Sequence, residues 1–169
     1  VVPAAPIDEP TLLRLVASLE KVSEHPLAEA IVRGAEERSV QIGPVTDFRS
    51  VTGKGVVGTV DGRTVAIGNT AMLAEMGATV TSTERADALR RNGETVMFVA
   101  VDGVYAGLVG VADRIKATTV EAIKALHHEG LRIVMLTGDS RVTAEAVARS
   151  VGIEAVEAEV LPEQKAAVI

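Results

Sequence analysis

LRIVMLTGDSR, residues 131 to 141, decides how the second part of the chain folds. Its first six residues form an apolar run of strand length, and Thr137-Gly138-Asp139 follow directly. A helical pattern at residues 117–128 precedes this run, and another at residues 141–150 follows it. Alternation of helix and strand is typical of βαβ units. The sequence therefore predicts parallel strands, with the Thr137–Asp139 loop at the carboxyl end of one of them.

Upstream of residue 112 the pattern changes to hairpins mixed with helices. Asp61-Gly62 joins two β-prone runs, and Asp102-Gly103 divides the segment 95–111 in the same way. Asp-Gly readily adopts the positive φ angles of a type I′ turn, so both pairs predict hairpins. Helices are predicted at residues 11–22, 26–35, 70–75 and 83–91. The fold class predicted for this part is a mixed α+β domain with an antiparallel sheet.

Composition restricts the possible partners. The chain has 169 residues, of which 47% are hydrophobic, which is enough to bury a core in one domain or two small ones. Its net charge of −6 argues against binding nucleic acid or anionic lipid. Without cysteine it can form neither disulfides nor thiolate metal sites. No targeting segment is read at the start, and Asp102 interrupts the most apolar stretch, so no membrane span is predicted.

Glu20 and His25 are candidates for binding a purine base. His25 lies where the second helix begins, so it either caps free N–H groups or presents a neutral ring that stacks on a base or donates a hydrogen bond. Glu20 is either a solvated helix charge or an acceptor for an exocyclic amine. Because the chain has no Trp and few other aromatic residues, a base would find few planar partners besides the imidazole.

The glycines of Gly53-Lys54-Gly55-Val56-Val57-Gly58 match the pattern GxGxxG without its required context. A dinucleotide loop leads into a helix, whereas these residues lead into a β-branched run. The glycines either form a turn entering a strand or let a ligand approach the backbone. Asn69, just before a helical segment, reads as an N-cap.

Two further candidates belong to phosphoryl chemistry. Thr137, Gly138 and Asp139 offer a hydroxyl, a flexible amide and a carboxylate that together can hold a tetrahedral phosphoryl group. The alternative is an ordinary loop in which Asp139 or Ser140 caps the next helix. Lys165 either supplies positive charge to that group or is a surface lysine.

Together and in this order, the motifs resemble those of copper-transporting (heavy-metal) P-type ATPases. Ser23–Ala28 is similar to the SEHPLA signature, Gly53-Lys54-Gly55 to the GxG loop, and Gly68-Asn69 to a third nucleotide-binding element. Further along, the elements similar to those of the family are the hinge element 113–116, the TGD loop 137–139 and the lysine segment 162–165.

The resemblance implies two domains. Residues 1–111, apart from a short initial connector, would form the nucleotide-binding domain, with ATP or ADP held by Glu20, His25, Gly53, Gly55 and Asn69. Residues 112–169 would form part of a haloacid-dehalogenase-like parallel α/β phosphorylation domain, with Thr137, Gly138, Asp139 and Lys165 at the phosphoryl site.

The implied parent is an ATP-hydrolysing Cu(I) exporter in the plasma (inner) membrane, with this region on its cytosolic face. Its actuator and transmembrane domains would be the partners, and the fragment itself is expected to be soluble and monomeric. The family's phosphorylated aspartate, in DKTGT, would precede residue 1, and the GDGxND segment that helps hold Mg²⁺ would follow residue 169. The fragment is therefore expected to bind nucleotide with an incomplete Mg²⁺ site and without turnover.

Two alternatives stay open at the level of sequence. One is a haloacid-dehalogenase-type phosphatase with residues 11–111 as its cap, which needs a nucleophilic aspartate that the sequence before the cap does not offer. The other is a non-enzymatic nucleotide-binding module. The transported metal is inferred only from overall likeness.

Overall fold

The computed structural model describes residues 1–81, 83–112 and 115–160. These residues form two compact units. The first unit holds residues 1–81, 83 and 96–111, and the second holds residues 84–95, 112 and 115–160. The predicted boundary near residue 111 stays a prediction, as does the hinge role of Asp113 and Arg114, which lie outside the described residues.

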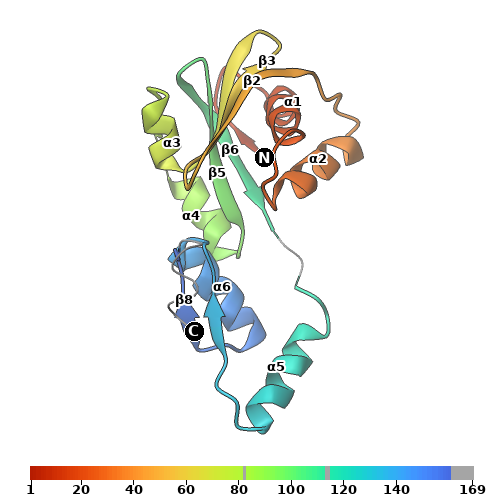
Figure 1. Cartoon of the computed structure of the whole chain (residues 1–169), viewed down its shortest axis with the longest axis vertical. Coiled ribbons are helices and arrows are strands. Elements are labelled where there is room, and N and C mark those ends of the chain that lie inside the picture. The colour runs from red at the N-terminus through yellow and green to blue at the C-terminus, as the bar shows by residue number, and fades with distance from the viewer. Residues whose placement is uncertain (82, 113–114, 161–169) are drawn as a thin grey trace. The chain divides into compact units, whose positions relative to one another are not determined.

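A six-stranded sheet organises the first unit, in the order β1-β6-β5-β4-β3-β2 (Figure 1). The strands are β1 (Val2–Pro3), β2 (Val45–Val51), β3 (Gly55–Val60), β4 (Arg63–Gly68), β5 (Thr95–Val101) and β6 (Val104–Val111). The pairs β1–β6, β2–β3, β3–β4 and β4–β5 are antiparallel. The predicted antiparallel sheet is confirmed.

Both Asp-Gly turns lie where the sequence predicts them. Asp61 and Gly62 have φ angles of 50° and 75°, and Asp102 and Gly103 have 52° and 75°. Consecutive positive φ angles define the type I′ turn, whose twist matches that of the strands it joins. These turns fix the register of β3 with β4 and connect β5 to β6.

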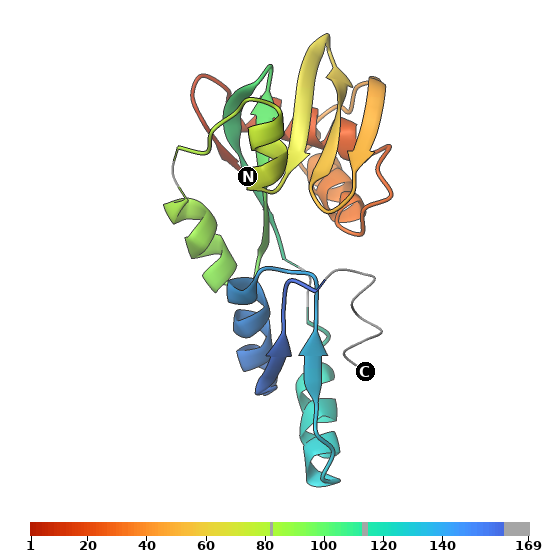
Figure 2. The ribbon, with the colours of Figure 1, turned by 60° about the vertical axis from the view of Figure 1, so that its left-hand side comes forward.

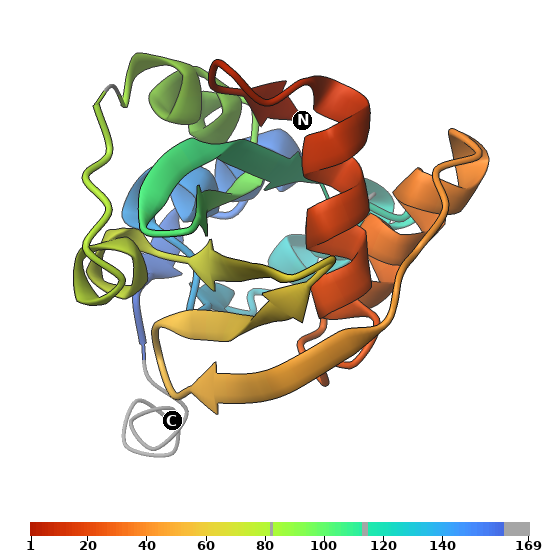
Figure 3. The same cartoon turned by 90° about the horizontal axis from the view of Figure 1, so that it is seen from above.

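Helices α1 (Glu9–Glu20) and α2 (Ala28–Glu37) lie on one side of the sheet, and α3 (Thr70–Glu75) lies on the other (Figures 2 and 3). Helix α1 begins where the Asp8 carboxylate accepts the Thr11 N–H at 2.9 Å. Its apolar face packs into the core, where Leu12, Val16 and Leu19 are fully buried. This packing fixes the end of α1, which carries Glu20.

Strand β2 was not predicted, for a reason visible in its backbone. Asp47 has a φ of 52°, and the register with β3 shifts between Thr46 and Arg49. Because of the bulge, the partly buried residues Val45 and Phe48 are three positions apart instead of two or four. The two-residue alternation of an ordinary strand is therefore missing from the sequence. Strand β1 is only two residues long and leaves no pattern.

The second unit contains the predicted parallel pair, β7 (Val134–Leu136) beside β8 (Ala155–Glu157). Helix α6 (Arg141–Val151) packs against β8 and against α4 (Glu84–Arg91), while α5 (Thr119–His128) contacts α6 and has no buried residue. β7 begins later than the apolar run suggests, because the Leu131 N–H donates to the Leu126 carbonyl and so completes the turn after α5.

No helix within the described ranges has both the length and the apolar character needed to cross a bilayer.

Candidate functional site

Glu20 is an unusual buried carboxylate at the end of α1. The residue is only 2% exposed, and its Oε2 atom has no hydrogen-bond partner within the described part of the chain. Burial raises the pKa of Glu20 above its ordinary value, and hydrogen bonding to Ser23 and the nearby His25 oppose that rise only in part. A buried acceptor without a donor is costly, so Oε2 is a place where a ligand N–H would be favoured.

The ring of His25 is oriented by the backbone that follows it. The Leu27 N–H donates to His25 Nδ1 at 3.2 Å, and the His25 N–H donates to Ser23 Oγ at 3.1 Å. Because Nδ1 accepts a hydrogen bond, the single N–H of the neutral imidazole is assigned to Nε2. His25 is exposed, so this Nε2–H can donate to a ligand. The predicted position at the mouth of the second helix is confirmed, although α2 begins at Ala28 rather than at Pro26.

The turn at Gly53–Gly55 uses its two glycines differently. Gly53 has a φ of 70°, and a Cβ there would meet nothing within 4 Å, so that side of the turn is open. Gly55 lies so close to β4 that a Cβ would run into the Ile67 carbonyl oxygen. The close approach of β3 to β4 therefore explains why residue 55 is a glycine. At Gly53 the backbone stays open, so a ligand can approach it.

Asn69 links this turn to α3 through the two polar atoms of its side chain. Its Nδ2 donates to the Gly53 carbonyl at 2.9 Å, and its Oδ1 accepts the Met72 N–H at 3.0 Å. Its backbone N–H donates to the Lys54 carbonyl at 2.9 Å. The predicted N-cap is confirmed, and the same residue also holds the glycine turn. Lys54 itself extends to α3, where its Nζ lies 2.7 Å from the Glu75 carboxylate.

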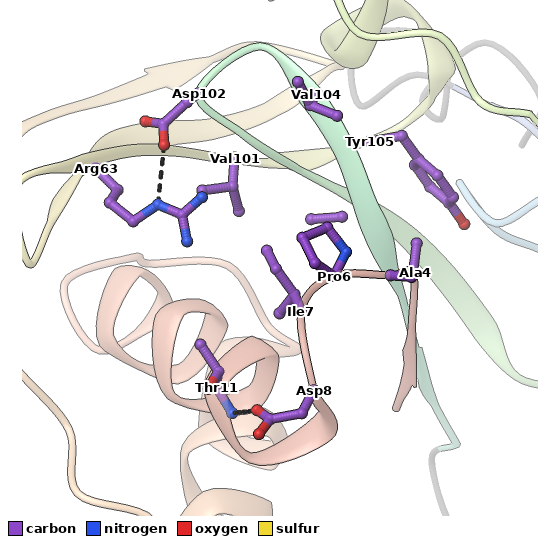
Figure 4. A pocket seen from close by; sticks show the side chains of 12 residues that line it. Ala4, Pro6, Ile7, Asp8, Thr11, Arg63, Val101, Asp102, Val104 and Tyr105 are labelled. Atoms are coloured by element: carbon purple, nitrogen blue, oxygen red, sulfur yellow. Dashed lines mark hydrogen bonds and ion pairs between the residues drawn. The ribbon is translucent and has the colours of Figure 1, made fainter.

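These residues form two clusters within the first unit, one around Glu20 and His25 and the other around Gly53, Gly55 and Asn69. A cavity of about 400 Å³ in the same unit lies elsewhere, and it contains none of the predicted nucleotide residues (Figure 4). Its lining includes Asp8, Arg63 and Tyr105, and the Arg63 guanidinium is paired with Asp102. The cavity therefore does not coincide with the predicted base site.

The loop Thr137–Asp139 follows β7, as predicted, in the second unit. The Thr137 hydroxyl donates to Asp139 Oδ2 at 2.9 Å and accepts the Asp139 N–H at 3.1 Å. Backbone bonds from Glu159 to Asp139 and from Val160 to Thr137 hold the loop against the residues after β8. Ser140, not Asp139, caps α6 by accepting the Thr143 N–H. The Asp139 carboxylate therefore does not cap α6.

One contact of this loop has no signal in the sequence. The Thr95 hydroxyl donates to Asp139 Oδ1 at 2.8 Å, although 44 positions separate the two residues. Lys165, the predicted source of positive charge, lies outside the described residues.

A few atoms of the described residues are suited to binding Mg²⁺ or ATP. Mg²⁺ is usually held by one or two carboxylates together with phosphate oxygens, and Asp139 offers such a carboxylate. The described residues contain no cluster of three or more His, Asp or Glu that could hold a metal ion without the phosphates. Within the described ranges Glu20 Oε2 has no donor, and His25 accepts a backbone N–H at Nδ1, so its ring can donate through Nε2. An adenine base presents an amine donor beside a ring-nitrogen acceptor.

Comparison with known proteins agrees with the motifs. A sequence model of the haloacid dehalogenase-like hydrolase family matches residues 4–169. The chain is 59% identical over 164 residues to a copper-transporting P-type ATPase of Rhizobium leguminosarum bv. viciae, which covers 96% of the chain and 20% of that protein. It is 49% identical over 165 residues to a silver exporting P-type ATPase of Salmonella typhimurium, again 20% of that protein's length.

A solved structure supports the same assignment. The crystal structure of a zinc-transporting PIB-type ATPase in its E2.Pi state matches with a TM-score of 0.68 and 31% identity, over 99% of this chain and 27% of that one. The chain thus spans about a fifth of the length of the curated relatives described above. The resemblance to the copper-transporting P-type ATPases is confirmed, and the chain belongs to the haloacid dehalogenase-like hydrolase family.

Proposed function

We propose that this chain is the ATP-binding cytosolic region of a copper-exporting P-type ATPase. The observation that carries the proposal is the buried Glu20 carboxylate, whose Oε2 has no donor among the described residues, close to a histidine whose Nδ1 accepts the Leu27 N–H and whose Nε2 is the donor. The 59% identity to a copper-transporting P-type ATPase supports copper as the cargo. The 49% identical silver exporter is the specific alternative.

In this proposal each cluster has a separate task. Glu20 Oε2 accepts from the exocyclic amine of adenine, and the His25 ring stacks on the base or donates to it. Gly53 exposes backbone toward the ligand, while Gly55 and Asn69 keep that turn in shape. Thr137, Gly138, Asp139 and Lys165 are the phosphoryl-site elements that the second part of the chain contributes to the parent protein. In the parent protein, ATP would transfer its phosphoryl group to the aspartate of a DKTGT segment and leave as ADP; residues 1–169 do not contain that segment.

The separate roles of nucleotide and aspartate determine what the isolated chain should do. Positioning two reactants can lower the activation barrier by about 7 to 11 kcal/mol, but only when both reactants are present. The printed sequence contains no DKTGT segment, so the chain alone should bind ATP or ADP without hydrolysing it. In the whole protein the region would work on the cytosolic face of the membrane, together with the actuator and transmembrane domains.

Calorimetric titration of the chain with ATP and GTP tests the proposal. We expect ATP to bind with a dissociation constant on the order of 0.1 to 1 mM, and GTP to bind at least about tenfold more weakly, because guanine presents a carbonyl where adenine presents its amine. Glu20→Gln should lower the preference for ATP. Glu29→Gln, which removes the same charge from an exposed position on α2, is the matched control.

Two results would contradict the proposal. One is the absence of any ATP binding at millimolar nucleotide. The other is equal loss of affinity in Glu20→Gln and Glu29→Gln, which would indicate a general charge effect rather than a contact with the base.

A further inference from the structure

The carboxylate of Asp139 is held from two directions within the second unit. Thr95 donates its hydroxyl to Oδ1 at 2.8 Å, and Thr137 donates its hydroxyl to Oδ2 at 2.9 Å. Each carboxylate oxygen therefore has its own donor. A carboxylate bonded through both oxygens cannot rotate about its last torsion without breaking one of the bonds, so its plane is fixed before any ligand arrives.

The segment that carries Thr95 is itself tied to α6. The Thr143 hydroxyl donates to the Glu94 carbonyl at 3.1 Å, and Thr143 is only 2% exposed. The Thr143 N–H in turn donates to Ser140 Oγ at 3.3 Å. Residues 94 and 95 are therefore anchored on the same loop and helix whose carboxylate Thr95 bonds. Thr95 is also β-branched, so its χ1 angle is restricted and its hydroxyl is held in place.

We infer that Thr95 is a positioning residue for Asp139 in phosphoryl transfer, an inference that rests on the function proposed above. A side chain of a phosphoryl-site loop is effective when its orientation is set beforehand, since reorientation would otherwise add to the barrier. Thr137 is adjacent in sequence and holds one oxygen, whereas Thr95 supplies the second donor from a distant segment. Thr95 does not contact the reacting atoms and acts through Asp139.

The test uses the full-length protein that contains this chain. Thr95→Val keeps the shape of the side chain and removes the hydroxyl, whereas Thr95→Ser keeps the hydroxyl. We expect Thr95→Val to lower kcat for ATP hydrolysis, and the rate of phosphoenzyme formation, by about tenfold, with KM for ATP within about twofold of wild type. Thr95→Ser should restore most of the lost rate. Where valine prevents folding, Thr95→Ala takes its place.

Val151→Ala is the structural control, because Val151 is a buried apolar residue of α6 whose side chain cannot bond Asp139 or the segment that carries Thr95. It should lower the melting temperature at least as much as Thr95→Val does, since it leaves a cavity, while kcat stays within about twofold of wild type. A second readout is the amide spectrum of the 169-residue chain. The Asp139 and Ser140 signals should move in Thr95→Val and stay near their wild-type positions in Thr95→Ser.

Three results would overturn the inference: a kcat of Thr95→Val within twofold of wild type, an equal loss of kcat in Val151→Ala, or no recovery with serine. A wild-type full-length protein that neither hydrolyses ATP nor forms a phosphoenzyme would instead overturn the proposed function. The failure of one is therefore distinguishable from the failure of the other.

Discussion

Asn69 donates through Nδ2 to the carbonyl oxygen of Gly53 at 2.9 Å, and so ties the end of β4 to the glycine turn that precedes β3. Since its Oδ1 already caps α3, both ends of the amide are used within the protein. In the proposed function, Asn69 therefore affects nucleotide binding by shaping the turn, and this role can be separated from capping by substitution.

Asn69→Ser should keep the cap and lose the bond to Gly53. Serine is a good N-cap but its side chain ends one atom earlier, so α3 should persist while the amides of residues 53–55 exchange faster with solvent. Asn69→Ala should lose the cap as well, at a cost of about 1 kcal/mol. Hydrogen exchange measured by mass spectrometry or NMR checks both. Unchanged exchange in Asn69→Ser would show that the turn does not depend on this bond.

Gly53→Ala and Gly55→Ala should differ sharply in stability. Alanine at residue 53 meets no neighbour, so only the left-handed φ should lower the free energy of unfolding, by about 1 to 2 kcal/mol. Alanine at residue 55 would collide with the Ile67 carbonyl, and a displaced strand should cost about 3 kcal/mol or more. Urea unfolding measures both free energies. Loss of ATP affinity in a folded Gly53→Ala would then report the approach of ligand to the turn, whereas equal stabilities would contradict the strand packing described above.

His25→Asn separates the two tasks of the histidine. An asparagine carbonyl can accept the Leu27 N–H in place of Nδ1, but it offers neither a ring nor the donor at Nε2. We expect α2 to remain intact by circular dichroism and ATP affinity to fall by about tenfold. His25→Gln should also weaken binding. Full retention of affinity in the asparagine variant would mean that the ring does not contact the base.

Glu20→Gln should show that the ionised Glu20 carboxylate lowers the free energy of unfolding. Because burial raises the pKa of Glu20 in the folded state, the group favours folding below its unfolded pKa and loses that contribution as pH rises through its folded pKa. The free energy of unfolding of Glu20→Gln, relative to wild type, should therefore increase as pH rises above about 4, where an unburied glutamate titrates. Denaturant titrations at several pH values measure this, and a pH-independent difference would contradict the buried, desolvated state of the carboxyl.

Gly138→Ala probes the phosphoryl loop without disturbing the fold. A Cβ at this position would lie 3.5 Å from the Val160 carbonyl oxygen, an ordinary contact, and the residue does not have a left-handed φ. Stability should stay within about 0.5 kcal/mol of wild type. Phosphoenzyme formation in the full-length protein should nevertheless fall if phosphoryl oxygens approach this amide. A loss of stability larger than that of an ordinary surface substitution would contradict the open loop.

Local chemistry accounts for what the sequence could predict. The Asp-Gly turns, the cap at Asn69 and the βαβ alternation around Leu131–Arg141 depend on neighbouring residues, and the structure confirms each of them. Strand β2 could not be predicted because the bulge at Asp47 removes the two-residue alternation from the sequence.

Sites depend on contacts that sequence spacing does not encode. Sequence alone left open whether Glu20 is a solvated helix charge or a hydrogen-bond acceptor for a ligand. The packing of α1 buries it, and only the three-dimensional structure shows that Oε2 has no donor among the described residues. Thr95 gives no signal because its partner lies 44 positions away. The order of motifs indicated the family, whereas the role proposed for each side chain rests on its hydrogen bonds in the structure.

Titration of the isotope-labelled chain with ATP, followed by amide NMR, tests the central claim most directly. The account predicts that the signals of residues 23–30 and 53–58 shift together in a saturable way, and that GTP produces smaller shifts near Glu20 and His25. Signals of these segments that stay in place at millimolar ATP would contradict the assignment of this chain as an ATP-binding region.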